Sequence, residues 1–222
     1  MPSSAVSSQT PVRALLLVAP GCPHCARVLE GLSNLLKEGA LGRLEVVNVA
    51  IEPGPARELG VRSVPWARIG PFELAGLHSL EELRHWTAQT AREEGMTVYL
   101  ADLFATGRRA LAADRIRREP ALLPRLADLL GDSDNGLSVR IGVMATLEEL
   151  QDTGMLAGLH DRLAPLLAHP DARIRADACH ALALTGSPEA LALLRGCAGD
   201  PDPEVRETAR EGVEQLQGTE GA

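Results

Sequence analysis

The spacing of hydrophobic positions changes along the chain and divides the sequence into two parts. Residues 12–19 form a continuous apolar run with Arg13 as the only charge, a pattern typical of a strand covered on both faces of a sheet. Over 26–36, apolar residues recur every three or four positions, which predicts a helix with one buried face. A second strand is expected at 44–49, followed by a short helix at 55–59.

Two further strands are expected at 66–69 and 72–75, joined by a Gly-Pro turn. A last helix begins at Ser79, where Glu82 completes a capping box, and runs to about residue 92. The predicted order is strand, helix, strand, helix, strand, strand, helix. This order indicates an α/β domain with a mixed central sheet flanked by helices.

From residue 96 onward, a repeated helical pattern replaces the strands. An Asp in a turn precedes a Val-Arg or Ile-Arg pair that opens an Ala- and Leu-rich helix. These Asp and Arg residues are Asp134 and Arg140, Asp171 and Arg175, and Asp202 and Arg206. An amphipathic helix is expected before each, at 122–130, 156–167 and 188–194. Such pairs cannot bury their apolar faces alone, so we expect them to stack as an all-α solenoid.

The patterns predict two small domains with tails. Residues 1–11 are rich in Ser and Pro and are expected to be a disordered tail, and 12–94 form the α/β domain. The segment 95–119 is a helical connector or a degenerate first repeat. The repeats occupy 120–217, and 218–222 form a second tail.

Charge and composition narrow the classes of partner. The chain has a formal net charge of −8, and residues 96–222 hold 20 acidic against 13 basic residues. This excess repels nucleic acids and anionic membranes, so neither is an expected partner. The basic cluster at 108–118 is interpreted as a solvated helix face. No apolar run approaches the ~18 residues of a membrane span, and four cysteines are too few for a secreted disulfide framework, so we expect a cytoplasmic protein.

The clearest chemistry lies in Cys22-Pro23-His24-Cys25, between the first strand and the first helix. A redox dithiol needs two sulfurs that can bond, one of them reactive as a thiolate. Cys22 is expected at or just before the first helical turn, where free N–H groups and the helix dipole stabilise a thiolate. Pro23 suits the first helical position, and Cys25 is expected one turn in, more buried, as the resolving thiol. His24 can lower the pKa of Cys22 and make the couple more oxidising.

The alternatives for this pair are incidental cysteines or half of a zinc site. A zinc site usually has four ligands, and Cys179 and Cys197, 18 residues apart on the repeats, do not supply the missing ones. No metal or cofactor is therefore expected. Because free cysteines are among the most buried residues, core packing explains Cys179 and Cys197 better than a second redox role does.

Residues 12–92 resemble the thioredoxin superfamily in the order of their elements and in two motifs. The first is the Cys22–Cys25 motif, whose Pro-His dipeptide is that of the bacterial periplasmic disulfide oxidases. The resemblance implies a thiol–disulfide oxidoreductase with Cys22 and Cys25 as catalytic residues. The strand before the motif lacks the buried acid of thioredoxins, and Gly21 stands where they have tryptophan. The large helical insertion of the oxidases is also missing, so the direction of electron flow stays open.

The second motif is Val64-Pro65, which is similar to the cis-proline loop of the superfamily. The resemblance implies that Pro65 is cis and lies beside the dithiol. It also implies that the backbone of Val64 pairs with an extended substrate segment. Trp66 follows this loop and is expected near the dithiol, so these three residues are the predicted substrate-binding residues.

The C-terminal repeats resemble HEAT-like repeats of the short bacterial kind. This resemblance implies a curved surface that binds a protein partner, with the recurring Asp and Arg residues forming structural ladders between repeats. Some HEAT-like enzymes bind iron through His-Glu dipeptides, and none occurs in this sequence.

Three functions are compatible with these observations. The first is a thiol–disulfide oxidoreductase acting on protein or small-molecule disulfides, with the repeats docking a partner. The second is an interaction adaptor or redox sensor that uses the α/β domain for binding. The third is a carrier of a soft metal ion through Cys22 and Cys25, with His24 as a further candidate ligand. No oligomeric state is predicted.

Overall fold

The computed structural model of the chain describes residues 11–219. The chain divides into two compact units, a first unit that ends at residue 96 and a second unit that follows it. The tail predicted at 1–11 therefore lies almost entirely outside the described residues. The tail predicted at 218–222 begins within the last helix, which continues to Thr219.

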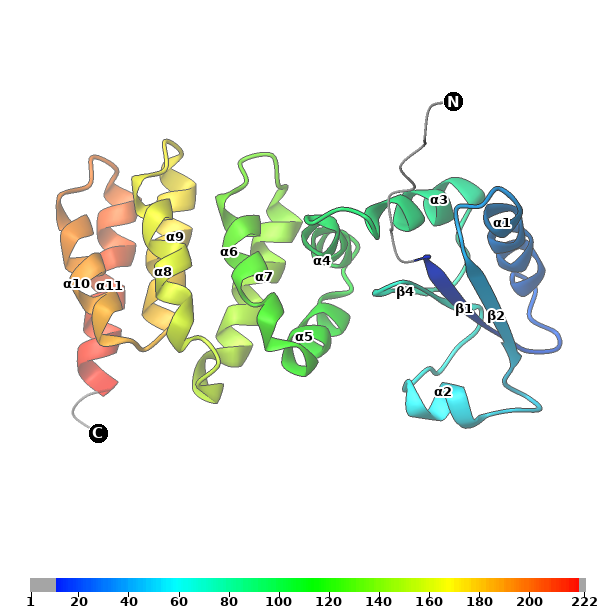
Figure 1. Cartoon of the computed structure of the whole chain (residues 1–222). Coiled ribbons are helices and arrows are strands. Elements are labelled where there is room, and N and C mark those ends of the chain that lie inside the picture. The colour runs from blue at the N-terminus through cyan, green and yellow to red at the C-terminus, as the bar shows by residue number, and fades with distance from the viewer. Residues whose placement is uncertain (1–10, 220–222) are drawn as a thin grey trace, which may run out of the picture. The chain divides into compact units, whose positions relative to one another are not determined.

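Four strands of the first unit form one mixed sheet in the order β2-β1-β3-β4 (Figure 1). The strands are β1 (Arg13–Val18), β2 (Arg43–Asn48), β3 (Trp66–Ile69) and β4 (Phe72–Ala75). β1 pairs in parallel with β2 and antiparallel with β3, and β4 pairs antiparallel with β3. The predicted mixed sheet is confirmed. The central place of β1 explains its continuous apolar run, in which Leu16 and Leu17 are fully buried.

Three helices complete the α/β part of this unit: α1 (Cys25–Lys37), α2 (Gly54–Glu58) and α3 (Leu80–Gln89). α1 and α3 lie on one side of the sheet and α2 on the other (Figure 1). α1 buries Val28, Leu32 and Leu35, at the three- and four-residue spacing of its apolar positions. Gly31 lets α3 approach closely, because a Cβ atom there would lie 2.7 Å from Cδ1 of Leu83.

The capping box predicted at the start of α3 is present. The Ser79 hydroxyl accepts a hydrogen bond from the Glu82 N–H at 3.2 Å, and the Glu82 carboxylate accepts one from the Ser79 N–H at 2.7 Å. These bonds favour the ionised carboxylate and hold the pKa of Glu82 below its ordinary value. They satisfy N–H groups that have no partner within the helix.

Replacing Ser79 with alanine is expected to lower the free energy of unfolding of the first unit by about 1 kcal/mol, because one N–H of α3 loses its acceptor. Trp66 and Trp86, the two tryptophans of the chain, both lie in this unit, so urea unfolding followed by tryptophan fluorescence isolates it. The Ser79→Asp variant keeps an N-cap acceptor and should unfold close to wild type. An equal loss of unfolding free energy in Ser79→Ala and Ser79→Asp would contradict the capping role of Ser79.

Within its described residues, the second unit consists of helices joined by loops and contains no strand. This confirms the predicted all-α architecture. Its α-helices are α4 (Gly95–Ala105), α5 (Arg109–Arg118), α6 (Pro124–Gly131), α7 (Leu137–Leu150), α8 (His160–Leu163), α9 (Ala172–Leu184), α10 (Pro188–Gly196) and α11 (Pro203–Thr219). Its 3-10 turns are η1 (Pro120–Leu122), η2 (Gln151–Thr153), η3 (Ala157–Leu159), η4 (Ala164–Ala168) and η5 (Cys197–Gly199). The segment predicted as a connector, 95–119, holds the helix pair α4 and α5.

The single amphipathic helix predicted over 156–167 is wrong. The structure divides this segment into η3, the short helix α8 and η4. Pro165 explains the change from α8 to η4, because it has no N–H to donate to the carbonyl four residues earlier. Leu159 and Leu163 are nevertheless buried, so the apolar face that the pattern predicted is still present.

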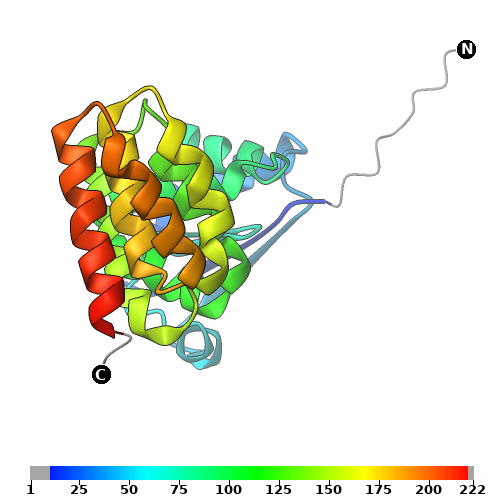
Figure 2. The ribbon, with the colours of Figure 1, turned by 90° about the vertical axis from the view of Figure 1, so that its left-hand side faces the viewer.

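Neighbouring helices of the second unit stack, as a solenoid requires. α9 contacts α7, α10 and α11. Figure 2 shows α9, α10 and α11 side by side. Gly212 on α11 permits this packing, because a Cβ atom there would lie 3.0 Å from Cβ of Ala183 on α9. Each helix pair thus buries its apolar face against the next.

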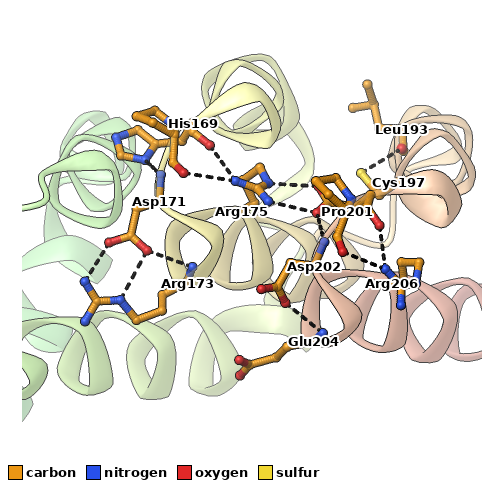
Figure 3. A network of polar contacts seen from close by, with 12 residues as sticks. His169, Asp171, Arg173, Arg175, Leu193, Cys197, Pro201, Asp202, Glu204 and Arg206 are labelled. Atoms are coloured by element: carbon orange, nitrogen blue, oxygen red, sulfur yellow. Dashed lines mark hydrogen bonds and ion pairs between the residues drawn. The ribbon is translucent and has the colours of Figure 1, made fainter.

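Arginines connect consecutive repeats through buried or half-buried ion pairs. Nε of Arg140 on α7 donates to Asp177 on α9 at 2.7 Å. Arg175 on α9 donates to both carboxylate oxygens of Asp200, at 2.8 Å each, in the loop after α10 (Figure 3). Arg206 on α11 donates to the backbone carbonyl of the same Asp200 at 2.7 Å. Arg140 and Arg175 therefore form the predicted ladder between repeats, whereas Arg206 bonds to the loop directly before its own helix.

The predicted ladder role is wrong for two of the recurring aspartates. Asp171 accepts a hydrogen bond from the Arg173 N–H at 2.9 Å and caps α9. Asp202 accepts one from the Glu204 N–H at 2.9 Å at the start of α11. These aspartates satisfy the free N–H groups of their own helices, and the arginines pair with Asp177 and Asp200 instead.

Candidate functional site

Cys22 and Cys25 are joined by a disulfide, with their Cα atoms 5.5 Å apart. The pair lies between the end of β1 and the start of α1. A tight turn leads into it, since the Cys22 N–H donates to the Ala19 carbonyl at 3.3 Å. Gly21 has a φ of +76° in this turn, a conformation that side chains with a Cβ rarely adopt. The Pro-Gly turn therefore places the first cysteine directly beyond the buried strand.

The helix starts later than the sequence predicts. α1 begins at Cys25, and its first backbone hydrogen bond runs from the Val28 N–H to the His24 carbonyl at 3.3 Å. Pro23 therefore lies in a turn before the helix, and Cys25 is its first residue, so the predicted helical positions of both are wrong, whereas the predicted burial of Cys25 is confirmed. The turn that ends at Cys22 leaves too few residues for helical hydrogen bonds before His24. Cys22 still lies at the N-terminal end of α1, where N–H groups are free.

The two sulfurs differ in accessibility. Cys25 is 7% exposed, whereas Cys22 is half-buried and Pro23 and His24 are exposed. His24 occupies the N-cap position, and its side chain makes no capping hydrogen bond. A macromolecular substrate therefore reaches Cys22 before Cys25.

The Val64–Pro65 loop lies at the same end of the sheet as the dithiol. Trp66, the first residue of β3, pairs with Leu17 near the end of β1. The Val64–Pro65 peptide bond is cis, and the Pro65 carbonyl accepts a hydrogen bond from the Gly76 N–H at 2.8 Å. Among the described residues, neither the N–H nor the carbonyl of Val64 makes a backbone hydrogen bond. The Val64 backbone is thus available to an added strand.

Trp66 is a core residue. Its side chain is buried and packs with Leu17 and Val47, and the half-buried Val61 and Val64 contact the same cluster. This cluster fixes the loop before β3 against the sheet. Of the three predicted substrate-binding residues, Pro65 and Trp66 are therefore buried, and Val64 is half-buried.

Two exposed apolar side chains at the same end of the sheet as the dithiol were missed by sequence reasoning. Leu77 is 41% exposed and follows β4, whose last residue pairs with Trp66. Ile51 is 82% exposed and follows β2, which ends beside Val18 of β1. Both side chains lie in loops without periodicity, and only the strand order brings these loops to the end of the sheet where Cys22 lies. We call Ile51, Val64 and Leu77 the apolar rim of the dithiol.

The described part of the chain holds no cluster of three or more His, Cys, Asp or Glu side chains suited to a metal ion. The soft-metal hypothesis rests on Cys22 and Cys25, with His24 as a further candidate ligand, and the two sulfurs are bonded to one another in this structure. Within residues 11–219, no helix is both long enough and apolar enough to cross a membrane.

Comparison with known protein families supports the helical part of the sequence analysis. A family model of HEAT repeats matches residues 160–222, the segment that contains α8 to α11. This match confirms the predicted HEAT-like character for that segment. No thioredoxin-family model matches the first unit. A search of curated proteins found no match to the chain.

Proposed function

We propose that the protein is a thiol–disulfide oxidoreductase whose first unit has a thioredoxin-like fold and whose HEAT-like repeats dock a protein partner. The disulfide between Cys22 and Cys25 carries this proposal, because it lies between a buried strand and a helix and leaves one sulfur more accessible than the other. The order β2-β1-β3-β4 and the Val64–Pro65 loop beside the dithiol agree with such a fold.

The exchange needs no further group. In the reduced protein, the Cys22 thiolate attacks one sulfur of a substrate disulfide, and the other substrate sulfur leaves as a thiolate. Cys25, once deprotonated, then attacks the Cys22 sulfur of this mixed disulfide. The second substrate sulfur leaves, and the Cys22–Cys25 disulfide forms. Two electrons pass from the protein to the substrate, and the reverse sequence oxidises a substrate dithiol.

The surroundings of the dithiol favour an extended polypeptide as substrate. The free backbone groups of Val64 can pair with a substrate strand, as in other cases of strand addition. Leu77 and Ile51 add exposed apolar surface on either side. A protein segment with apolar residues beside its cysteine would therefore bind at the apolar rim.

The first test is the equilibrium of the dithiol with glutathione. Full-length protein is equilibrated in glutathione buffers of graded potential, and the free thiols at Cys22 and Cys25 are counted by alkylation and peptide mapping. The expected result is one reversible two-electron transition that has the same midpoint from both directions. For such a couple, ~30 mV corresponds to a tenfold change in equilibrium constant.

The Cys22→Ser/Cys25→Ser protein is the control and should show no such transition in the first unit. Catalysed reduction of a protein disulfide, such as those of insulin, must accompany the transition in the native protein. A Cys22–Cys25 pair that stays reduced, or that cycles without exchanging with any protein disulfide, would contradict the oxidoreductase proposal.

The second candidate function is an interaction adaptor or redox sensor, and the HEAT match at 160–222 favours it. HEAT-like repeats bind proteins through stacked helices. If this function is the main one, the Cys22→Ser protein should bind the same partners with unchanged affinity and show no loss of function in the cell. Loss of partner binding in that variant would argue for the enzyme.

A further inference from the structure

Arg175 and Arg206 occupy equivalent places in consecutive repeats, near the starts of α9 and α11. Each uses Nη1 to donate to two backbone carbonyls, six and five residues earlier in the chain (Figure 3). The distances are 2.9 and 3.2 Å for Arg175 and 2.7 and 3.0 Å for Arg206. The loop before each helix therefore holds both guanidinium groups in the same way.

The remaining donors of the two arginines differ in what they bind. Nε and Nη2 of Arg175 donate to the two carboxylate oxygens of Asp200, at 2.8 Å each. Asp200 lies in the loop after α10, in the next repeat of the stack. Nε and Nη2 of Arg206 donate to no residue within 11–219. Arg206 thus presents a planar pair of donors, oriented by its backbone contacts, that fits a carboxylate.

An arginine without an acidic partner is exceptional in the second unit. In the part of the chain that the structure describes, only Arg195 and Arg206 of this unit form no ion pair with a carboxylate. Every other arginine of the unit pairs with an aspartate or a glutamate. Acidic residues outnumber basic ones by 20 to 13 over 96–222, so a shortage of carboxylates does not explain the two exceptions.

Arg195 and Arg206 line the same surface groove, of about 350 Å³, between α10 and α11. We call it the α10–α11 groove. Its lining also includes the buried Leu194 and the half-buried Val213. Arg210 lines it too, but two glutamates already pair with this guanidinium. The groove therefore combines apolar surface with two cations that have no acidic partner among the described residues.

We propose that the α10–α11 groove docks an acidic segment of a partner protein. One Asp or Glu carboxylate of this segment accepts hydrogen bonds from Nε and Nη2 of Arg206, as Asp200 does from Arg175. Arg195 attracts a neighbouring acidic group, and apolar side chains of the segment cover Leu194 and Val213. The inference rests on the docking role proposed for the repeats, and it names the chemistry of the partner.

The charge of the unit separates this occupant from a polyanion. The acidic excess over 96–222 repels a nucleic acid, which carries a phosphate at every nucleotide. A protein segment with one or two carboxylates beside apolar residues matches the groove and adds little further negative charge. Because Arg206 is already held by its own loop, it loses little conformational freedom when the carboxylate binds.

The test selects peptides from a random display library on full-length Cys22→Ser/Cys25→Ser protein under reducing conditions, so that no peptide is retained through a disulfide. Enriched peptides should carry an Asp or Glu beside apolar residues. The Kd of the tightest peptide is then measured by fluorescence anisotropy. Arg206→Gln in the protein, or the acid-to-amide change in the peptide, should raise this Kd at least about tenfold. The two changes together should cost little more than either alone, because they remove the same contact.

Arg210→Gln is the matched control on the same helix and in the same groove. It should change the Kd by less than about twofold, because the Arg210 guanidinium is already paired with Glu207 and Glu214. Arg206→Lys keeps the positive charge and should recover only part of the affinity, because an ammonium lacks the planar fork. Circular dichroism checks that each variant is folded, and the amide peptide tests the same contact on the unchanged protein.

Three results would overturn the proposal. In the first, every enriched peptide binds the Arg206→Gln protein equally well, so that the repeats dock a partner at another surface. In the second, no peptide is enriched at all, which would also remove the support for a docking role. In the third, light scattering shows self-association that Arg206→Gln abolishes, so that a second copy of the chain occupies the groove. The glutathione equilibrium of Cys22 and Cys25 is measured on other residues, so these results leave that test unaffected.

Discussion

Replacing Cys25 with serine is expected to accumulate substrate proteins on Cys22 as stable mixed disulfides. In the proposed exchange, the more accessible Cys22 attacks the substrate, and the buried Cys25 releases it. Without Cys25, the first step proceeds and the second cannot. Non-reducing electrophoresis followed by mass spectrometry of the Cys22-linked species measures the accumulation. Turnover of a protein disulfide should fall by about a thousandfold or more, as expected when a nucleophile of a coupled pair is lost.

The matched control is Cys22→Ser, which makes the same change of one sulfur to oxygen three residues earlier. It should lose turnover equally and trap nothing, because serine does not attack a disulfide at neutral pH. Both variants are made with Cys179→Ser and Cys197→Ser, so that the repeats contribute no thiols. Equal trapping by the two variants would reverse the assigned roles, and an absence of trapping by either would remove the support for a protein substrate.

The sequence predicts the elements of the first unit well, because their determinants are local. The apolar run at 12–19 became a central strand, and the capping box at Ser79 began a helix in the expected place. The start of α1 was predicted wrongly, because the turn ending at Cys22 competes with the helix for the residues around Pro23. Local patterns do not show whether residues that both a turn and an adjacent helix could include belong to the turn or to the helix.

The remainder of the candidate site depends on contacts between distant segments. Leu77 and Ile51 lie at the same end of the sheet as the dithiol because of the strand order, which no periodicity specifies. The repeat pattern identified Arg175 correctly, but its partner Asp200 lies in the next repeat and precedes the recurring aspartate of the motif. Such pairings follow from the stacking of helices.

Replacing Arg175 with glutamine is expected to loosen the last repeats strongly. The Arg175 guanidinium donates to both oxygens of Asp200 and also to the backbone carbonyls of His169 and Pro170, at 2.9 and 3.2 Å. The side chains of the ion pair are only 12% and 9% exposed, so removing the arginine leaves Asp200 as a poorly hydrated charge without its partner. We expect the melting temperature of the second unit to fall by roughly 5 °C or more. Hydrogen exchange of α9 and α11 peptides should rise with it.

Arg173 provides the control on the same helix. Arg173 forms an ion pair with Asp171, and the Arg173 side chain is 66% exposed. Arg173→Gln should therefore change the melting temperature little. Arg175→Lys should recover only part of the loss, because an ammonium cannot donate to two carboxylate oxygens in the planar geometry of a guanidinium. If Arg175→Gln and Arg173→Gln lower the melting temperature equally, the Arg175–Asp200 pair stabilises the repeats no more than an exposed ion pair does.

The effect of Arg175 should also depend on pH in a defined direction. Hydrogen bonds from Arg175 hold the pKa of Asp200 below its ordinary value, so the native state binds this proton more weakly than the unfolded state does. The stabilisation is therefore complete above about pH 4, the ordinary range of an aspartate, and is lost as the pH falls through the lower folded value. The gap in melting temperature between wild type and Arg175→Gln should be wide at pH 7 and should narrow below pH 4. A gap that stays constant with pH would mean that the carbonyl contacts to His169 and Pro170, and not the Asp200 carboxylate, give Arg175 its effect.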